Sequence, residues 1–479
     1  MSQNPPARHP PPEARATPPL RRRRAAFRFT LRRLGALQTA TLLGWLLTSI
    51  AIELLGRLSD LRTPGPQRPR RRQQRRERRA AALVGVLGRL KGPFAKLGQF
   101  AALRVDVLSE ATRERLATLQ DRVPPLPFPE IRAVVEAELG APLEAHFASF
   151  EPEPIGAASI AQAHRARLPG GERVVVKVQY PWLASSLPVD LAVLRLLVAI
   201  WSRSRPSGQP EGRRLFEEFA RSLREELDFE HEAALAAEVA RNLADDPAVV
   251  VPRVIASHSR RRVLVMSHHE AVPILDREAL RRLGVEPGQV MEILARAYAK
   301  QIFVDGLFHA DPHPGNLFVV DEPSARERPR ILFVDFGLSR RLTPELRQEL
   351  RRGAYALLAG DPGAFLAGME RMSMIAPGAR ADVEAAVRSM FDHIRGEEKA
   401  PLSLAGDRVL ALKDQAKTLL LATPGLKLPA DLLLYAKTLS YLFALGAELA
   451  PEVDLMRISV PYLLRFLAEK EEEPARPGP

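Results

Sequence analysis

The chain has 479 residues, of which 46% are hydrophobic, enough for a sizeable core in two or three domains or one two-lobed enzyme. It contains no cysteine, which excludes disulfides, thiolate metal sites and cysteine nucleophiles. The net charge of +13 is uneven: residues 1–79, with nineteen arginines and four acids, carry +15, so the remaining 400 residues carry −2. Basic nucleic-acid readers carry their charge on the folded domain, so we expect no specific nucleic-acid partner. A charged appendage favours an anionic membrane surface, and a solvated tail without a partner is the alternative.

The N-terminal region divides into three parts. Residues 1–20 are rich in proline, lack the layout of a signal peptide and are predicted to be disordered. Leu34–Leu55 is a moderately apolar run of 22 residues with arginine-rich flanks on both sides. Two basic flanks disfavour a spanning helix, so we expect a helix on the cytoplasmic face of a membrane; a single span and packing on the protein's own body are the alternatives. Residues 63–79 form a Pro/Arg linker.

Folded sequence is predicted from about residue 80. Apolar spacing predicts helices at about 81–104, 109–120, 129–140, 183–202 and 212–244. Alternating runs predict strands at about 145–151, 159–168, 172–180, 249–255 and 261–267, with a hairpin turn at 169–171. Beyond about 274 the pattern is helical, interrupted by two apolar strands around a polar loop within 316–337. This order predicts an α+β fold of the bilobal kinase type.

The stretch HADPHPGN, His309–Asn316, holds two histidines and a carboxylate. Prolines within it exclude a helical zinc pair, so we expect His309 and His313 to be structural rather than metal ligands. The spacing of Asp311 and Asn316 is that of a phosphoryl-transfer loop, in which the Asp orients or deprotonates the attacking group and the Asn binds Mg²⁺. We therefore predict Asp311 as the catalytic base or water-positioner and Asn316 as a metal ligand.

Three further elements occur in the order that a kinase requires. Asp335 in VDFG is predicted to be the second metal-binding carboxylate. Lys177 closes VVVK on the third predicted strand, where kinases place the lysine that clamps the α- and β-phosphates. A small-residue loop, Pro154–His164, precedes it between two predicted strands. Together these elements imply ATP and Mg²⁺ as cofactors.

Residues 80–470 resemble the UbiB/AarF family of atypical kinase-like proteins, which is linked to ubiquinone and other isoprenoid-lipid metabolism. Three motifs carry the resemblance: K-x-G-Q at Lys96–Gln99, the alanine-rich loop GAASIAQAH, and E-x-D at Glu226–Asp228. The first two separate the chain from aminoglycoside and choline kinases. The first loop alanine of the family is Gly156 here, and the hinge sequence SHHEAVP also departs from the family pattern.

The resemblance implies a K-x-G-Q helical extension at 80–144, a kinase-like N-lobe at 145–273 and a helical C-lobe at 274–479. Lys96 and Gln99 would occlude the nucleotide pocket, with Glu226 and Asp228 as partners. Glu232 is the expected partner of Lys177, and Glu225, Glu226 and Glu230 are alternatives. The residues expected to line the nucleotide site are Ile155, Gly156, Ala157, Ala158, Ser159, Ile160, Ala161, Gln162, Ala163, Lys177 and Glu232.

Alanine in the loop limits the approach of backbone N–H groups to phosphates, because a Cβ intrudes where glycine leaves room. We therefore expect ATP hydrolysis, or phosphorylation of a small lipophilic molecule, at a membrane and in support of quinone metabolism. The expected partners are an anionic membrane surface and a lipophilic molecule or quinone-biosynthesis enzymes. A true protein kinase and a nucleotide-gated membrane scaffold are the alternatives.

Overall fold

The computed structural model describes residues 125–203, 209–396, 423 and 425–469, together with positions 40, 44, 48, 51 and 55, which are helical and exposed. The K-x-G-Q residues Lys96 and Gln99 lie outside the described residues, as do the predicted helices at 81–104 and 109–120 and most of 34–55. These assignments stay predictions.

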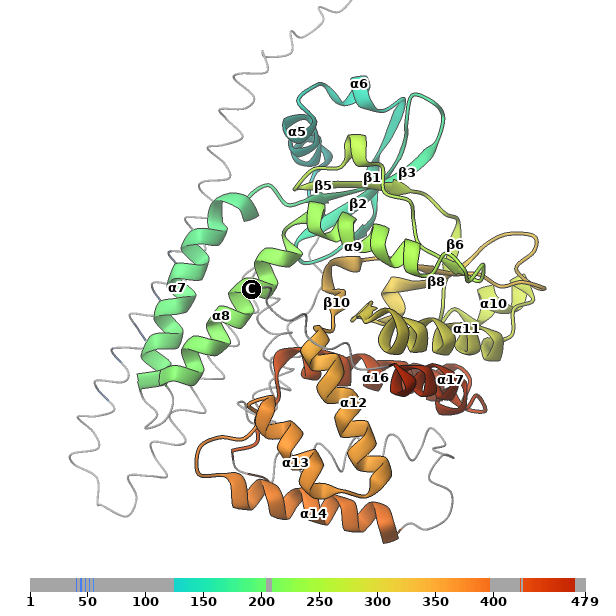
Figure 1. Ribbon diagram of the computed structural model, residues 1–479. Helices are drawn as coiled ribbons and strands as arrows, with labels where there is room; N and C mark the ends of the chain where they lie inside the picture. The colour runs from blue at the N-terminus through green and yellow to red at the C-terminus, as the bar shows by residue number, and fades with distance from the viewer. Residues whose placement is uncertain are drawn as a thin grey trace, which may run out of the picture.

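The upper lobe is built on an antiparallel four-stranded sheet in the order β1-β2-β3-β5 (Figure 1). Its elements are α5 (Phe128–Leu139), α6 (Leu143–His146), β1 (Ser149–Ala157), β2 (Ala161–Arg167), β3 (Arg173–Gln179), α7 (Leu183–Arg203), α8 (Gln209–Glu226), α9 (Phe229–Asn242) and β5 (Val263–Ser267). The predicted helices at 129–140 and 183–202 are confirmed by α5 and α7.

Strand β3 divides its side chains between the two faces of this sheet. Val174, Val176 and Val178 are fully buried in a cluster with the apolar residues of α5. Successive side chains of a strand point to opposite faces, so Lys177 points away from α5. Directly opposite Lys177 on β2 lies Ala163, so both side chains share the face turned toward α9.

The helix predicted over 212–244 is two helices, α8 and α9, with a break at Leu227–Asp228. The Asp228 carboxylate accepts hydrogen bonds from the backbone N–H groups of Glu230 and His231 and so caps α9. Aspartate is a preferred N-cap because its side chain satisfies N–H groups that a helix leaves unpaired. The apolar spacing continues across Leu227–Asp228, so it did not predict this break.

Two strand predictions are corrected. The strand expected at 145–151 begins at Ser149, because Leu143–His146 forms the short helix α6. The expected loop at 154–164 is mostly strand: β1 continues to Ala157 and β2 starts at Ala161. The turn itself spans three residues and is closed by a bond of 2.8 Å from the Ala158 N–H to the Ala161 carbonyl.

The lower lobe is mainly helical and carries small sheets at its junction with the upper lobe. A second sheet has the order β4-β9-β8-β6, and β7 pairs with β10. The strand predicted at 249–255 is only Val249–Val250 and joins this lower sheet, parallel to β9. The elements are β4 (Val249–Val250), β6 (Ala271–Pro273), α10 (Arg277–Leu283), α11 (Pro287–Ala299), a π-helix (Lys300–Asp305), β7 (Leu307–Phe308), β8 (Leu317–Val320), β9 (Ile331–Phe333), β10 (Arg340–Arg341), α12 (Pro344–Ala359), α13 (Pro362–Arg371), α14 (Arg380–Gly396), α16 (Ala430–Leu449) and α17 (Leu455–Ala468).

Helix α16 belongs to the lower lobe, where it lies beside α17 and α11 (Figure 1). Leu442, Phe443 and Leu445 are buried in the largest apolar cluster. By length and composition alone, Asp431–Leu449 would suffice to cross a membrane, with a mean hydropathy of 1.3 and 39% of the window buried. One such helix is weak evidence for a membrane span, and part of the apolar surface of α16 is buried against the core of the lower lobe.

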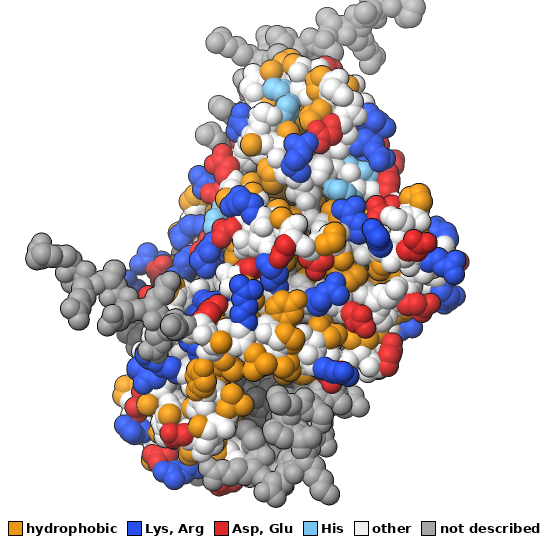
Figure 2. All heavy atoms as spheres, turned by 45° about the vertical axis from the view of Figure 1, so that its right-hand side comes forward, with side chains coloured by type: hydrophobic (Ala, Val, Ile, Leu, Met, Phe, Trp, Pro, Cys, Tyr) orange, Lys and Arg blue, Asp and Glu red, His pale blue; other side chains and the backbone are white. Residues whose placement is uncertain are grey.

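Basic and acidic side chains are interspersed over the face of the described residues drawn in Figure 2. This mixture accords with the near-neutral charge of the chain beyond residue 79. A single-sign field of the kind that steers a polyanion is not seen on this face.

Candidate active site

Lys177 joins three elements through one ammonium group. Its Nζ donates to Glu232 Oε1 and Oε2 of α9 at 2.8 and 3.0 Å. It also donates to Asp335 Oδ1, which follows β9, at 2.9 Å. The structure thus pairs Lys177 with Glu232 among the glutamates that the sequence left open, and joins both to the DFG aspartate.

The electrostatics of this cluster are unbalanced toward negative charge. Burial raises the pKa of Glu232 to about 7, against the opposing charge of Lys177 and with a contribution from Asp335 and Glu226. Burial lowers the pKa of Lys177, but Asp335 and Glu232 outweigh burial and leave that pKa raised. Carboxylate oxygens of Glu232 and Asp335 and the Cγ of Glu226 thus lie around Gly337, and Lys177 binds the first two of these residues.

Asp335 is held in an uncommon backbone conformation. Its φ of 63° and ψ of 77° lie in the left-handed region, which costs a non-glycine residue about 1–3 kcal/mol. His309 holds this turn: its Nε2 donates to the carbonyls of Val334 and Asp335 at 3.0 and 2.9 Å. Its Nδ1 then accepts from the Tyr298 hydroxyl at 3.2 Å, and burial together with the charge of Asp311 raises the pKa of Tyr298.

His309 and His313 therefore have structural contacts. His309 is fully buried, and His313 Nδ1 accepts from the Gly315 N–H at 3.1 Å within the catalytic loop. Among the described residues, no group of three or more His, Asp or Glu side chains has the arrangement of a metal site. The His-rich appearance of the stretch thus reflects loop anchoring.

The Asp311 carboxylate is held from two sides. Asn316 Nδ2 donates to Asp311 Oδ2 at 3.1 Å and to its carbonyl at 3.2 Å. Lys437 of α16 donates to Asp311 Oδ1 at 3.2 Å. The buried Thr438 hydroxyl shares its one hydrogen between the Ala310 carbonyl at 3.1 Å and the Leu434 carbonyl of its own helix at 2.9 Å, so it joins α16 to the loop.

Asn316 and Asp335 lie on neighbouring backbone segments. The Val334 N–H donates to the Asn316 carbonyl at 3.0 Å, at the start of the β8–β9 pairing. Because Asn316 Nδ2 is directed to Asp311, its amide oxygen is turned away from that carboxylate. This oxygen and the Asp335 carboxylate are the ligand types that Mg²⁺ prefers.

The alanine-rich turn is rigidly held against β3. The Tyr180 hydroxyl donates to the Ala158 carbonyl at 2.9 Å, and the Tyr180 N–H donates to the Ile160 carbonyl at 3.0 Å. Gly156 pairs with Ala163, which faces the same side as Lys177, so these small residues border the lysine. Ser159, Ile160 and Ala161 are buried, whereas Ile155 is exposed and Ala157 is half-buried.

Gln162, one of the residues expected to line the nucleotide site, turns its side chain away from the Lys177 face of the sheet. Its side chain lies on the α5 face of β2, where Oε1 accepts from the Leu126 N–H at 2.8 Å and Nε2 contacts His164 at 2.9 Å. Strand alternation places it opposite to its neighbour Ala163. Its side chain therefore fixes the segment entering α5 instead of facing the cleft.

The E-x-D residues take two different positions. Glu226 lies at the end of α8 near Gly337, with the Cγ of Glu226 3.8 Å from where a Cβ on that glycine would stand. Asp228 caps α9 and thereby sets the phase that directs Glu232 to Lys177. Their expected pairing with Lys96 and Gln99 lies outside the described residues.

Sequence reasoning missed Lys437 and Thr438. They lie 126 and 128 positions after their partners in the catalytic loop, and α16 reads as an ordinary apolar helix. The sequence contains no local signal for such contacts.

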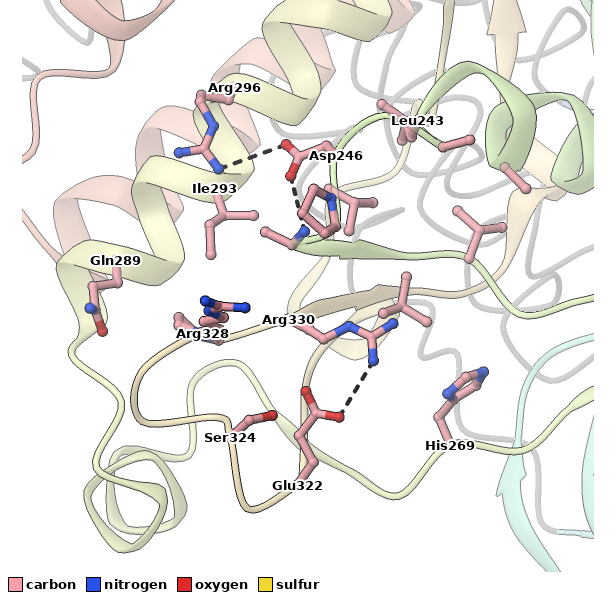
Figure 3. Close-up of a pocket in the computed structure, with 18 of the residues that line it drawn as sticks. Leu243, Asp246, His269, Gln289, Ile293, Arg296, Glu322, Ser324, Arg328 and Arg330 are labelled. Atoms are coloured by element: carbon pink, nitrogen blue, oxygen red, sulfur yellow. Dashed lines mark hydrogen bonds and ion pairs between the residues drawn. The ribbon is translucent and has the colours of Figure 1, made fainter.

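A cavity of about 1070 Å³ lies apart from this site, between α9, α11 and the β8–β9 connection (Figure 3). None of the described site residues lines it. Two ion pairs border it: Arg296 with Asp246 at 3.7 Å, and Arg330 with Glu322 at 3.4 Å. Its lining mixes apolar side chains, such as Leu243 and Ile293, with these charged groups.

A strand lysine paired with a helix glutamate, an Asp–Asn catalytic loop and a DFG turn between two lobes define a kinase-like protein. Residues 118–366 match the ABC1 atypical kinase-like domain. The chain belongs to this family and is a member of its UbiB branch.

Relatives support the assignment over most of the chain. A protein of Marinobacter nauticus named probable protein kinase UbiB is 33% identical over 391 residues, covering 79% of this chain and 68% of that protein. The Arabidopsis thaliana protein named activity of bc1 complex kinase 8, chloroplastic, is 32% identical over 412 residues, covering 80% and 53%. The structure of Rv3197 from Mycobacterium tuberculosis with erythromycin matches with a TM-score of 0.52 at 25% identity, covering 83% of this chain and 98% of that one.

Proposed function

We propose that the protein binds ATP with Mg²⁺ and either hydrolyses it or transfers its γ-phosphoryl group to a small lipophilic molecule. The observation that carries the proposal is the single network joining Lys177, Glu232 and Asp335 across the two lobes. In kinases this linkage between the strand lysine, a helix glutamate and the DFG aspartate accompanies a competent site.

Each residue has a distinct part. Lys177 would bind the α- and β-phosphates, and Glu232 orients it. Asn316 and Asp335 would hold Mg²⁺, which neutralises phosphate charge when bound. Asp311 would orient the attacking hydroxyl or water. Its carboxylate is held in one position because each oxygen accepts a hydrogen bond from a fixed donor, and each oxygen can accept a further one from the attacking group.

The proposed setting is the cytoplasmic face of a membrane, in support of isoprenoid-lipid metabolism of the ubiquinone type. Two observations support it. Residues 1–79 carry the excess positive charge that anionic lipid attracts, and relatives of this chain carry the name UbiB. The lipophilic substrate or a quinone-biosynthesis enzyme would be met at that surface.

The test is an ATPase assay of the full chain with Mg²⁺, with and without vesicles containing anionic lipid. Asp311→Asn, which keeps the shape of the side chain, should lose about 100-fold or more in turnover while nucleotide binding persists. Equal activity of wild type and Asp311→Asn would contradict the catalytic assignment. Robust transfer to added peptides would favour a true protein kinase, and a cell in which Asp335→Asn retains function would favour a scaffold.

A further inference from the structure

Helix α16 makes three contacts to the loop His309–Asn316. Thr438 binds the Ala310 carbonyl, Lys437 binds Asp311, and the Tyr441 ring lies against His313 with 6.4 Å between ring centroids. Tyr441 lies four positions after Lys437 and three after Thr438, so it neighbours both of them on the helix surface. The loop is therefore held by an element remote from it in sequence.

Lys437 is the charged member of this set. Its side chain is 20% exposed, and its Nζ lies 5.4 Å from the centre of the Tyr441 ring, a contact that restricts the side chain. The loop Asp311–Asn316 contains no arginine or lysine of its own. The cation beside Asp311 thus comes from another part of the fold.

The two donors on Asp311 act on different oxygens. Asn316 Nδ2 is 3.1 Å from Oδ2, and Lys437 Nζ is 3.2 Å from Oδ1. One donor alone leaves the carboxylate able to rotate about its Cβ–Cγ bond, whereas two opposed donors fix the plane of the group. Charge-assisted bonds are the stronger kind, so Lys437 contributes much of this restraint.

We infer that Lys437 is a positioning residue for Asp311: it fixes the carboxylate that orients the attacking group. The inference rests on the proposed phosphoryl-transfer function and deepens it. A misplacement of about 1 Å in a reacting arrangement costs about 100-fold in rate, so loss of this bond should reduce turnover without reducing nucleotide binding.

The experiment compares Lys437→Met and Lys437→Arg with Asp311→Asn and the double variant Asp311→Asn/Lys437→Met in full-length protein. We expect Lys437→Met to lower kcat by about 10- to 100-fold, with KM for ATP and the affinity for a fluorescent ATP analogue within about twofold of wild type. Lys437→Arg should recover part of kcat. In the double variant Lys437→Met should have little further effect, because its action runs through Asp311.

Lys300→Met is the matched control, since Lys300 is similarly enclosed at 18% exposed but pairs with Asp305 away from the loop. If Lys300→Met loses as much unfolding free energy as Lys437→Met but keeps the wild-type kcat, general destabilisation does not explain the kcat loss of Lys437→Met. Wild-type kcat in Lys437→Met, or an undiminished Lys437→Met effect in the Asp311→Asn background, would overturn the inference. Wild-type activity in Asp311→Asn would instead refute the proposed function itself.

Discussion

Replacing Lys177 with methionine should destabilise the upper lobe far more than neutralising its partner. Lys177 Nζ binds three carboxylate oxygens within 3.0 Å, and Glu232 is only 2% exposed. Removing one partner of a buried ion pair costs about 3–5 kcal/mol, because the other charge stays buried. Uptake of a proton by Glu232 limits the loss, so we expect about 3 kcal/mol near pH 7.

Glu232→Gln is the contrasting variant. It leaves Lys177 bound to Asp335 at 2.9 Å and replaces one carboxylate by an amide that still accepts a hydrogen bond. The expected cost is about 1–2 kcal/mol, typical of a weakened bond to a charged group. The cost of Lys177→Met should also grow as the pH rises from 6.5 to 8.5, because the unpaired Glu232 resists ionisation.

The assay is urea unfolding followed by tryptophan fluorescence. Trp182 reports on the upper lobe, since it stacks on Tyr180 directly after β3, with ring centroids 5.0 Å apart. Equal destabilisation by Lys177→Met and Glu232→Gln, or a Lys177→Met cost independent of pH, would refute this account of the buried pair.

Three further results are expected. Glu232 holds its proton more tightly in the folded protein than in the unfolded chain, so its protonation favours folding at low pH. This contribution to the unfolding free energy is lost as the pH rises from about 4.5 to about 7. The difference in urea midpoint between wild type and Glu232→Gln should therefore change over this range, and a constant difference would contradict the expectation. Asp228→Ala should cost about 1 kcal/mol of unfolding free energy through loss of the α9 cap, and Asp228→Asn much less; equal costs would argue for a role of the charge itself. Thr438→Val removes the hydroxyl that the Ala310 and Leu434 carbonyls share and should cost about 1–3 kcal/mol, whereas Thr438→Ser should be close to wild type, both measured by denaturation.

The local arrangement of the candidate site could be predicted from the sequence. Two prolines and the Asp311–Asn316 spacing described a phosphoryl-transfer loop, because both residues belong to one short segment whose geometry is set nearby. The lysine at the end of VVVK was placed on a strand by its alternating neighbours, and β3 has that register. The hinge and loop departures from the family pattern did not disturb either element.

Other features depended on contacts between distant segments. Helical phase alone admitted several glutamates, and the break capped by Asp228 decided that Glu232 meets Lys177. The sequence placed Gln162 in the loop expected to line the nucleotide site. In the structure it lies within β2, and its side chain is on the α5 face of the sheet.

The sequence by itself thus determined the kinase-like class and the main order of the elements, and it predicted the roles of Asp311, Asn316 and Asp335, since these follow from residue type and short-range spacing. Only the tertiary structure decided that α16 supplies Lys437 and Thr438 to the catalytic loop. The physical reason is that contacts across 126 and 128 positions arise when an apolar helix packs on the core. The spacing of apolar residues predicts which face of a helix is buried, but it does not predict which residues that face contacts.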